Sequence, residues 1–148
     1  MTEHLRLSKV VAYITRISAQ GGTELLVFDH RDFPEAGTQV PAGTVEEGEA
    51  IETALVREVE EETGLAGCSV VREIAVYDWV HPDTHNTHER HVFHMLAPDN
   101  MPETWTWIET SGGAVPESEG YVFVFRWMPL DRPIDLVGNQ GDYLDSLR

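Results

Sequence analysis

Hydrophobic and polar residues follow a helix-like period in one segment of the chain and strand-like runs in several others. The period predicts a helix that begins around Glu49–Ala50 and ends near Thr63–Gly64, where the glycine suits a left-handed cap. Dense β-type runs predict strands at Lys9–Ile17, Glu24–Asp29, Cys68–Val80, Arg90–Leu96, Trp105–Glu109 and Tyr121–Met128. The Cys68–Val80 run is long enough to bend, and Asn139–Arg148 is compatible with a short closing helix. With more strands than helices and no repeat, the pattern indicates a single α+β domain over residues 1–148.

The acidic positions of the predicted helix do not follow the usual amphipathic pattern. At about 100° per residue, three glutamates continue nearly the same sector as the apolar stripe that starts at Ile51 and Leu55. These are Glu58, Glu61 and Glu62. Like charges three and four residues apart each cost a helix about 0.2–0.5 kcal/mol, and a solvated acidic face would lie opposite the apolar stripe. A bound cation would offset this cost, so we expect the second half of the helix to be a metal site.

The spacing of particular residues in this segment resembles the Nudix box, in which glycine, glutamate and an Arg-Glu-apolar-x-Glu-Glu-x-Gly-apolar run recur at fixed intervals. Every constrained position is filled, by Gly43, Glu49, Arg57, Glu58, Val59, Glu61, Glu62, Gly64 and Leu65. The resemblance implies a Nudix-type α/β/α sandwich around a mixed β-sheet. It also implies water attack on phosphorus in a diphosphate linkage.

The same resemblance suggests how the box residues divide the chemistry. Hydrolysis of a diphosphate needs hard cations on the phosphate oxygens and a water in line with one phosphorus. Carboxylates suit Mg²⁺, with Mn²⁺ as a possible substitute. Glu61 and Glu62 are implied as principal ligands, and Glu58 as a ligand or as the base for the attacking water. A further implied ligand is the carbonyl of Ala42, which stands where a second glycine is frequent in the family.

Several residues around the metal helix are given supporting roles by the resemblance. Arg57 is expected to anchor a carboxylate and hold loop and helix in register, from a position about 100° away from the metal face. Glu49 would stabilise the loop–helix junction or touch a metal through water, and Gly43 would allow a tight loop. A further carboxylate commonly reaches the metals from a loop. Glu117 and Glu119 are the candidates, and Glu119 is preferred as ligand or water-activating base because it lies closer to the Tyr121–Met128 strand, although a solvated loop acid is equally compatible.

Arginine and aromatic side chains offer candidate contacts to a substrate. Arg31 precedes the box on a loop, where a guanidinium could grip a phosphate or a base, although a surface salt bridge is equally compatible. Tyr77 and Trp79 would share one strand face, and Trp105 and Trp107 another. Tryptophan on a strand is more often a packing residue than a platform for a ligand.

Five histidines gather in residues 81–94. We expect His85 and His88 to contact substrate phosphate or base from a polar loop. A structural zinc site is the alternative, but it favours fixed spacing on rigid elements. His91 and His94 would instead fall on opposite faces of a strand.

Composition and charge limit the partners. Ten basic residues against 26 acidic ones give a formal charge of −16, which argues against bulk nucleic acid because phosphates are neutralised by Lys and Arg. A phosphorylated small molecule, such as a nucleotide derivative, remains compatible where divalent cations screen the repulsion. The first residues lack the apolar core of a signal peptide and no segment approaches membrane-spanning length, so no membrane partner and a cytoplasmic location are expected. A homodimer is possible.

The interpretation that fits best is a Mg²⁺-dependent hydrolase that cleaves a diphosphate linkage in a nucleoside diphosphate derivative. A second is a module on the same fold that senses a nucleotide or nucleotide sugar without hydrolysing it. Such modules often lose a box glutamate, and this chain has lost none. A third is an isomerase or accessory domain, for which the box usually departs from the pattern kept here.

Overall fold

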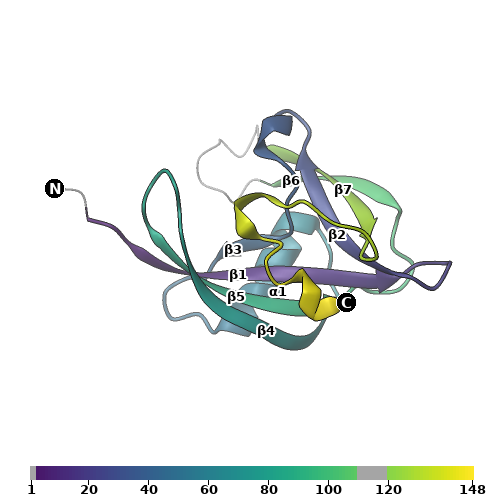
Figure 1. Ribbon diagram of the computed structural model, residues 1–148, viewed down its shortest axis with the longest axis horizontal. Coiled ribbons are helices and arrows are strands. Elements are labelled where there is room, and N and C mark those ends of the chain that lie inside the picture. The colour runs from purple at the N-terminus through teal and green to yellow at the C-terminus, as the bar shows by residue number, and fades with distance from the viewer. Residues whose placement is uncertain (1–2, 110–119) are drawn as a thin grey trace.

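A seven-stranded mixed sheet runs through the computed structural model, which describes residues 3–109 and 120–148 (Figure 1). The strands are β1 (Arg6–Ile17), β2 (Thr23–His30), β3 (Ala42–Thr44), β4 (Ser69–Val80), β5 (Thr87–Leu96), β6 (Thr104–Glu109) and β7 (Tyr121–Pro129). Their order is β4-β5-β1-β2-β7-β6, and β3 pairs with β1 beside this path. β1 and β5 are parallel, whereas the other pairs are antiparallel.

One face of the sheet is covered by the helix α1 (Ile51–Thr63). Its predicted ends are confirmed: Ala50 is the extended N-cap, and Gly64 takes the left-handed conformation with φ of 76°. Ala54, Leu55 and Val59 are buried on its inner side. They pack against a buried row from the sheet that includes Val10, Ala12, Ile14, Leu26, Phe28, Phe93 and Phe125. Burial of this apolar stripe is what fixes the orientation of the glutamates that follow it.

The opposite face of the sheet is covered by the C-terminal segment, drawn in yellow in Figure 1. This layer packs on a second buried cluster, composed of Val11, Tyr13, Leu25, Val27, Val40, Val92, Leu130 and Leu144. The predicted α+β sandwich is confirmed, but the second layer differs from the α-helical one expected. The helix predicted for Asn139–Arg148 is wrong, because the structure has two short 3-10 turns, η2 (Val137–Asn139) and η3 (Leu144–Leu147). The backbone hydrogen bonds of this segment join residues three apart, as from the Leu144 N–H to the Gly141 carbonyl and from the Ser146 N–H to the Tyr143 carbonyl, which is the 3-10 pattern.

The predicted strands are confirmed, and the structure adds one strand that was not predicted. The long β4 is interrupted twice in its pairing with β5, between Val70 and Arg72 and between Glu73 and Ala75, which agrees with the expectation that it bends. β3 was not predicted, since its three residues lie inside the glycine-bearing loop before α1. A third 3-10 turn, η1 (Pro34–Ala36), lies in the loop after β2. Among the residues described, α1 is too short and too polar to cross a membrane, and so is every other helical segment.

Candidate active site

The three glutamates of α1 differ in how deeply they are buried. Glu62 is buried, with 9% of its surface exposed, while the side chains of Glu58 and Glu61 are 14% and 35% exposed. Burial raises the pKa of Glu62 well above its ordinary value, and the charges of the neighbouring carboxylates add to this effect. Burial also raises the pKa of Glu58, against the opposing effect of Arg57. The end of α1 therefore concentrates carboxylates that are costly to keep ionised without a cation.

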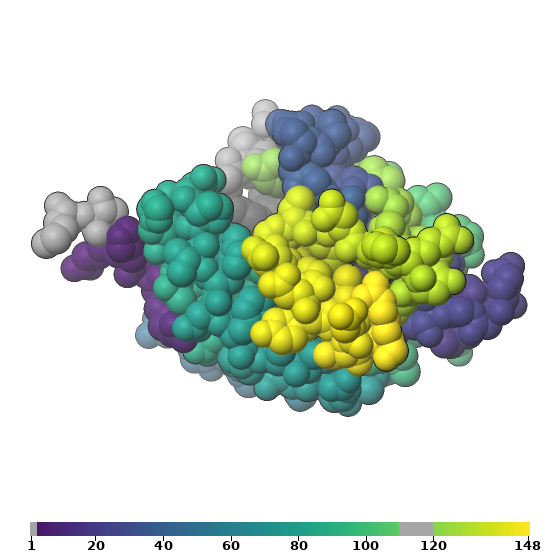
Figure 2. Space-filling view, in the orientation of Figure 1, coloured from purple at the N-terminus to yellow at the C-terminus, as the bar shows by residue number. Residues whose placement is uncertain are grey.

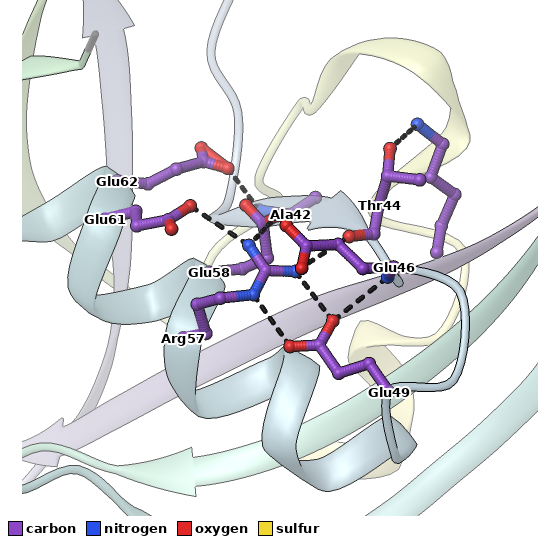
Figure 3. Close-up of polar contacts among 9 residues, drawn as sticks. Ala42, Thr44, Glu46, Glu49, Arg57, Glu58, Glu61 and Glu62 are labelled. Carbon is purple, nitrogen blue, oxygen red and sulfur yellow. Dashed lines mark hydrogen bonds and ion pairs between the residues drawn. The ribbon is translucent and has the colours of Figure 1, made fainter. Parts of the chain in front are cut away.

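Arg57 contacts both the loop before α1 and the glutamates on it (Figure 3). Its Nε and Nη2 donate to the two carboxylate oxygens of Glu49, each at 2.8 Å. Its Nη1 donates to Glu58 Oε1 at 2.8 Å and to Glu61 Oε2 at 3.1 Å. The hydrogen bonds from Arg57 and from the Glu46 backbone N–H lower the pKa of Glu49 to about 2. The long guanidinium thus reaches the carboxylates of Glu58 and Glu61 even though Arg57 lies about 100° away from them around the helix.

Gly43 occupies a place where no side chain fits. A Cβ at this position would lie 1.9 Å from Cδ of Glu58. Gly43 is part of β3 and pairs with Val10 of β1. It therefore lies in a strand rather than in the tight loop that was expected. The missing side chain is what lets the Glu58 carboxylate pass over β3.

Ala42 faces the same carboxylates through its backbone. Its N–H donates to Glu62 Oε1 at 3.1 Å, whereas the neighbouring Pro41 carbonyl accepts from Ala12 of β1. In a strand, the N–H and C=O of one residue point to the same side. The Ala42 carbonyl therefore lies on the outer edge of β3, on the side of Glu62.

Glu109 is a fourth carboxylate near this site that sequence reasoning missed. It is the last residue of β6 and is 7% exposed, and its charge raises the pKa of both Glu58 and Glu62. The signal that could have found it is the strand period. Trp105, Trp107 and Glu109 share one face of β6, and both indoles donate to carbonyls at the end of α1, those of Thr63 and Glu61.

The remaining predicted site residues lie in different places. Arg31 is exposed and pairs with the adjacent Asp32 at 3.1 Å. His85 is exposed in the β4–β5 turn, with φ of 60° and its ring 5.8 Å from that of His4. His88 lines a pocket that also includes Ala42. Glu119 lies outside the described residues.

The histidine cluster does not form a set of metal ligands. His94 shares a 2.7 Å hydrogen bond with Thr15, and His91 one of 2.9 Å with Glu89. As positions i and i+3 of β5, the two imidazoles lie on opposite faces of the sheet. Over residues 3–109 and 120–148, no group of three or more His, Cys, Asp or Glu side chains is placed to hold a metal ion as it stands. The zinc alternative gains no support from this geometry.

The glutamate donors of α1 nevertheless fit Mg²⁺ in kind. They offer carboxylate oxygens only, which are the ligands that this hard cation prefers. Glu62 is buried with a raised pKa, so that a cation would relieve its cost. Because Arg57 engages Glu58 and Glu61, their carboxylates would need to turn from the guanidinium toward the ion.

The mixed sheet, the strand β3 that carries Gly43 and the glutamate-bearing helix α1 together define an α+β sandwich with an acidic site at the end of its helix. The family model described as NUDIX domain matches residues 7–146. The chain therefore belongs to the NUDIX family. A search of curated proteins finds no match.

Several solved structures share this fold. The MutT NUDIX hydrolase from Burkholderia pseudomallei has a TM-score of 0.67 and 21% identity, covering 98% of this chain and 100% of that one. The NUDIX domain of Shewanella oneidensis NrtR, complexed with ADP ribose, has a TM-score of 0.64 and 16% identity, covering 100% and 88%. A UDP-X diphosphatase has a TM-score of 0.64 and 17% identity, covering 99% of this chain and 64% of its own. At these identities, the likeness establishes the fold, and the chain spans only 64% of the length of that diphosphatase.

Proposed function

We propose that this protein is a Mg²⁺-dependent hydrolase that cleaves a diphosphate linkage in a nucleoside diphosphate derivative. The observation that carries the proposal is the buried Glu62, which lies beside Glu58 at the end of a helix with a complete box. Burial raises the pKa values of both carboxyl groups, so a bound cation would favour their ionised forms. Membership of the NUDIX family supports the same conclusion.

In this proposal, Glu58, Glu61, Glu62 and the Ala42 carbonyl hold the metal. Bound Mg²⁺, or Mn²⁺ in its place, would supply positive charge to the phosphate oxygens. Glu58 is also a candidate base for the attacking water, because its pKa is raised and its carboxylate lies over β3. Arg57 positions Glu58 and Glu61 through its hydrogen bonds.

Glu109 is proposed as an additional carboxylate of the same site. Its burial and its electrostatic effect on Glu58 and Glu62 support this role. Glu119 stays a second candidate for it. We expect Glu109→Gln to weaken Mn²⁺ binding about tenfold, measured by electron paramagnetic resonance of the free ion. Unchanged Mn²⁺ affinity in Glu109→Gln, together with a loss in Glu119→Gln, would assign the role to Glu119 instead.

The substrate class draws on the relatives. The names of two of them, a UDP-X diphosphatase and a domain complexed with ADP ribose, both specify a nucleoside diphosphate derivative. Arg31, His85 and His88 remain the proposed substrate contacts. Of these, His88 has the strongest support, because it lines a pocket that adjoins Ala42 and Gly43.

The decisive experiment is a panel of nucleoside diphosphate derivatives, incubated with Mg²⁺ or with EDTA and assayed for released phosphate products. Mg²⁺-dependent cleavage of any member supports the hydrolase. Tight binding without cleavage across the panel would favour a sensing module, and rearranged products without hydrolysis would favour an isomerase.

A further inference from the structure

A pocket of about 320 Å³ opens on the face of the sheet opposite α1. We call it the Lys9–Arg90 pocket, and its lining is Lys9, Val11, Gln39, Ala42, Gly43, Trp79, His81, His88, Arg90, Val137, Gly138 and Gln140. It lies between the β4–β5 hairpin and the C-terminal segment, which border a hollow on the face shown in Figure 2. Its volume falls at the lower end of the range for small-molecule sites.

Neither of two cations in this pocket forms an ion pair with a carboxylate of the described residues, although burial, which lowers the pKa of Lys9, is opposed by the charges of Glu58 and Glu62 from across β3. Lys9, the only lysine of the chain, donates to the hydroxyl of Thr44. Arg90 is 6% exposed and donates to Tyr77 Oη at 3.0 Å and to the Gly138 carbonyl. For neither does the described structure give a carboxylate oxygen within 4.0 Å.

This arrangement is unusual in a chain with a formal charge of −16. Carboxylates are abundant, and most of the arginines pair with one. Those with a paired carboxylate are Arg6, Arg16, Arg31, Arg57, Arg126, Arg132 and Arg148. A buried cation without a counter-ion is costly, so the pocket is suited to a mobile anion.

The Arg90 guanidinium is held in place by its surroundings. It lies 4.0 Å from the centroid of the Trp79 ring, and the indole N–H of Trp79 donates to Asn139 Oδ1 at 3.0 Å. The C-terminal turn thus fixes both side chains, which leaves little freedom to lose when an anion binds.

The imidazoles in the pocket add polar groups without adding charge. Burial and the nearby charges of Lys9, Arg90 and His81 lower the pKa of His88 to about 4. His88 is therefore neutral near pH 7, where it can both donate and accept a hydrogen bond. Together with the side-chain amides of Gln39 and Gln140, His88 adds hydrogen-bonding groups to the lining of the pocket.

The pocket and the acidic helix meet at the short strand β3. Lys9 and Val11 of β1 face the C-terminal cluster, whereas Val10 faces α1. On one face of β3, the Glu58 side chain packs against Gly43. On the other, the Thr44 hydroxyl accepts a hydrogen bond from Lys9. Among the residues that the structure describes, β3 pairs with β1 alone, so its free outer edge lies between the carboxylates and the cations.

We propose that Lys9 and Arg90 bind phosphate oxygens of the substrate without a metal, so that the diphosphate crosses the outer edge of β3. The glutamates of α1 then hold cations on one side of this edge, and the Lys9–Arg90 pocket takes the other phosphate and its attached group. The polar lining selects a nucleoside or sugar and disfavours a long aliphatic chain. This inference rests on the proposed function for its substrate, but the pocket can be tested without any hydrolysis.

The test is binding of inorganic pyrophosphate and of ADP in EDTA, measured by isothermal titration calorimetry. Lys9→Met keeps the aliphatic stem and removes the charge. We expect it to weaken binding of both probes at least tenfold, in line with the strength of a charge-assisted hydrogen bond. The matched control is Arg72→Met, which removes one positive charge from an exposed residue of β4 that donates to the Ser146 carbonyl. We expect its effect to be less than twofold.

Equal losses in Lys9→Met and Arg72→Met would overturn the proposal, because they would reflect net charge alone. So would unchanged binding in Lys9→Met, which would mean that Lys9 only screens the neighbouring glutamates. Wild-type protein that binds neither probe in EDTA at millimolar concentration would overturn it as well. Amide NMR of the wild type with pyrophosphate in EDTA gives a check that needs no variant: shifts should centre on Lys9, Trp79 and Arg90.

The two proposals fail separately. Glu62→Gln should keep metal-free binding of pyrophosphate, since the pocket lies on the other side of β3. Metal-free binding in a protein that never hydrolyses the panel would refute the hydrolase and leave the pocket standing. Mg²⁺-dependent hydrolysis with a wild-type KM in Lys9→Met would refute the pocket and leave the hydrolase standing.

Discussion

Burial gives the glutamates of α1 different chemical settings although they belong to one helix face. Glu62 is buried and accepts a backbone N–H from β3, whereas Glu61 is the most exposed of the three. Glu58 is intermediate in exposure and forms an ion pair with Arg57. A carboxylate that stays buried on a chain with so many exposed acids has a specific function at its position.

Replacing Glu62 by glutamine should therefore cost activity more than stability. We expect Glu62→Gln to lower turnover at least 100-fold, because it removes a charged ligand at the place where phosphate charge is neutralised. The fold should be retained, since the amide keeps the shape of the side chain and burial opposes the charge. Steady-state kinetics on the best substrate of the panel and a circular-dichroism melt measure both effects.

The matched control is Glu52→Gln on the first, exposed turn of α1. It removes the same charge from the same helix and should leave turnover within twofold. Near wild-type turnover in Glu62→Gln would refute the assignment of a metal site to this helix.

Gly43 makes a second prediction at this scale. Gly43→Ala places a methyl group at 1.9 Å from Glu58 Cδ, so the carboxylate must move away from β3. We expect turnover to fall at least tenfold while the melting temperature changes little, because the flexible glutamate can swing outward. The comparison is Gly22→Ala in the β1–β2 turn, where the nearest atom lies at 3.7 Å. Equal turnover in the two variants would contradict the steric role of Gly43.

Individual residues could be predicted from the sequence where helix geometry decides them. The sector shared by Glu58, Glu61 and Glu62 followed from the helical period alone. Two features did not follow. The four contacts of Arg57 depend on how a long side chain curls, and the proximity of Glu109 depends on β6 packing beside α1. Both are tertiary facts that no local period encodes.

At the scale of elements, the end of α1 is held by β6. The indole N–H groups of Trp105 and Trp107 donate to the Thr63 and Glu61 carbonyls at 3.0 and 2.7 Å. These carbonyls belong to the last turn of the helix, where carbonyl groups have no hydrogen-bond partner within the helix. Gly64 completes this junction, since a Cβ there would meet the Trp107 ring at 2.5 Å. The strand thus positions the turn that carries the proposed metal ligands.

Trp107→Phe tests this junction, because phenylalanine keeps most of the ring and loses the donor. We expect a loss of about 0.5–1.5 kcal/mol in the free energy of unfolding, together with weaker Mg²⁺ binding. Trp127→Phe is the control, since it also loses an indole hydrogen bond, in this case to the Pro102 carbonyl at 3.1 Å and away from α1. Urea denaturation should show a larger destabilisation in Trp127→Phe, because Trp127 is buried and Trp107 is exposed, but Mg²⁺ titration should show weaker binding only in Trp107→Phe. Equal Mg²⁺ affinity in the two would contradict a positioning role.

Elements with a strong local pattern were predictable, and those without one were not. The ends of α1 are encoded by its apolar period and by Gly64. β3 has three residues and exists because β1 offers it an edge. The C-terminal turns likewise depend on the sheet beneath them, which buries Leu144, and their backbone hydrogen bonds join residues three apart rather than four.

At the scale of the whole molecule, the formal charge of −16 opposes folding through self-repulsion. Mg²⁺ should therefore stabilise the protein in two ways, by general screening and by specific binding. Specific binding contributes about 2.7 kcal/mol at a hundredfold excess over Kd. We expect Mg²⁺ to raise the melting temperature more than NaCl at equal ionic strength, and EDTA to reverse the difference.

The excess over NaCl should disappear in Glu62→Gln and persist in Glu52→Gln. Differential scanning fluorimetry of the three proteins provides the measurement. An identical excess in Glu62→Gln would show that Mg²⁺ acts on the surface charge in general rather than at α1.

The order of the strands has a consequence for how the chain is made. β1 and β2 form the first hairpin, but each of them needs another neighbour from much later in the chain, β5 for the former and β7 for the latter. During synthesis, β1 and β2 are therefore made before the strands that pair with their outer edges, and the edge of β2 stays unpaired until residues 121–129 have been added. Unpaired strand edges of this kind invite pairing with other chains. The newly made hairpin is therefore the part of this sheet most exposed to mispairing before β5 and β7 join it.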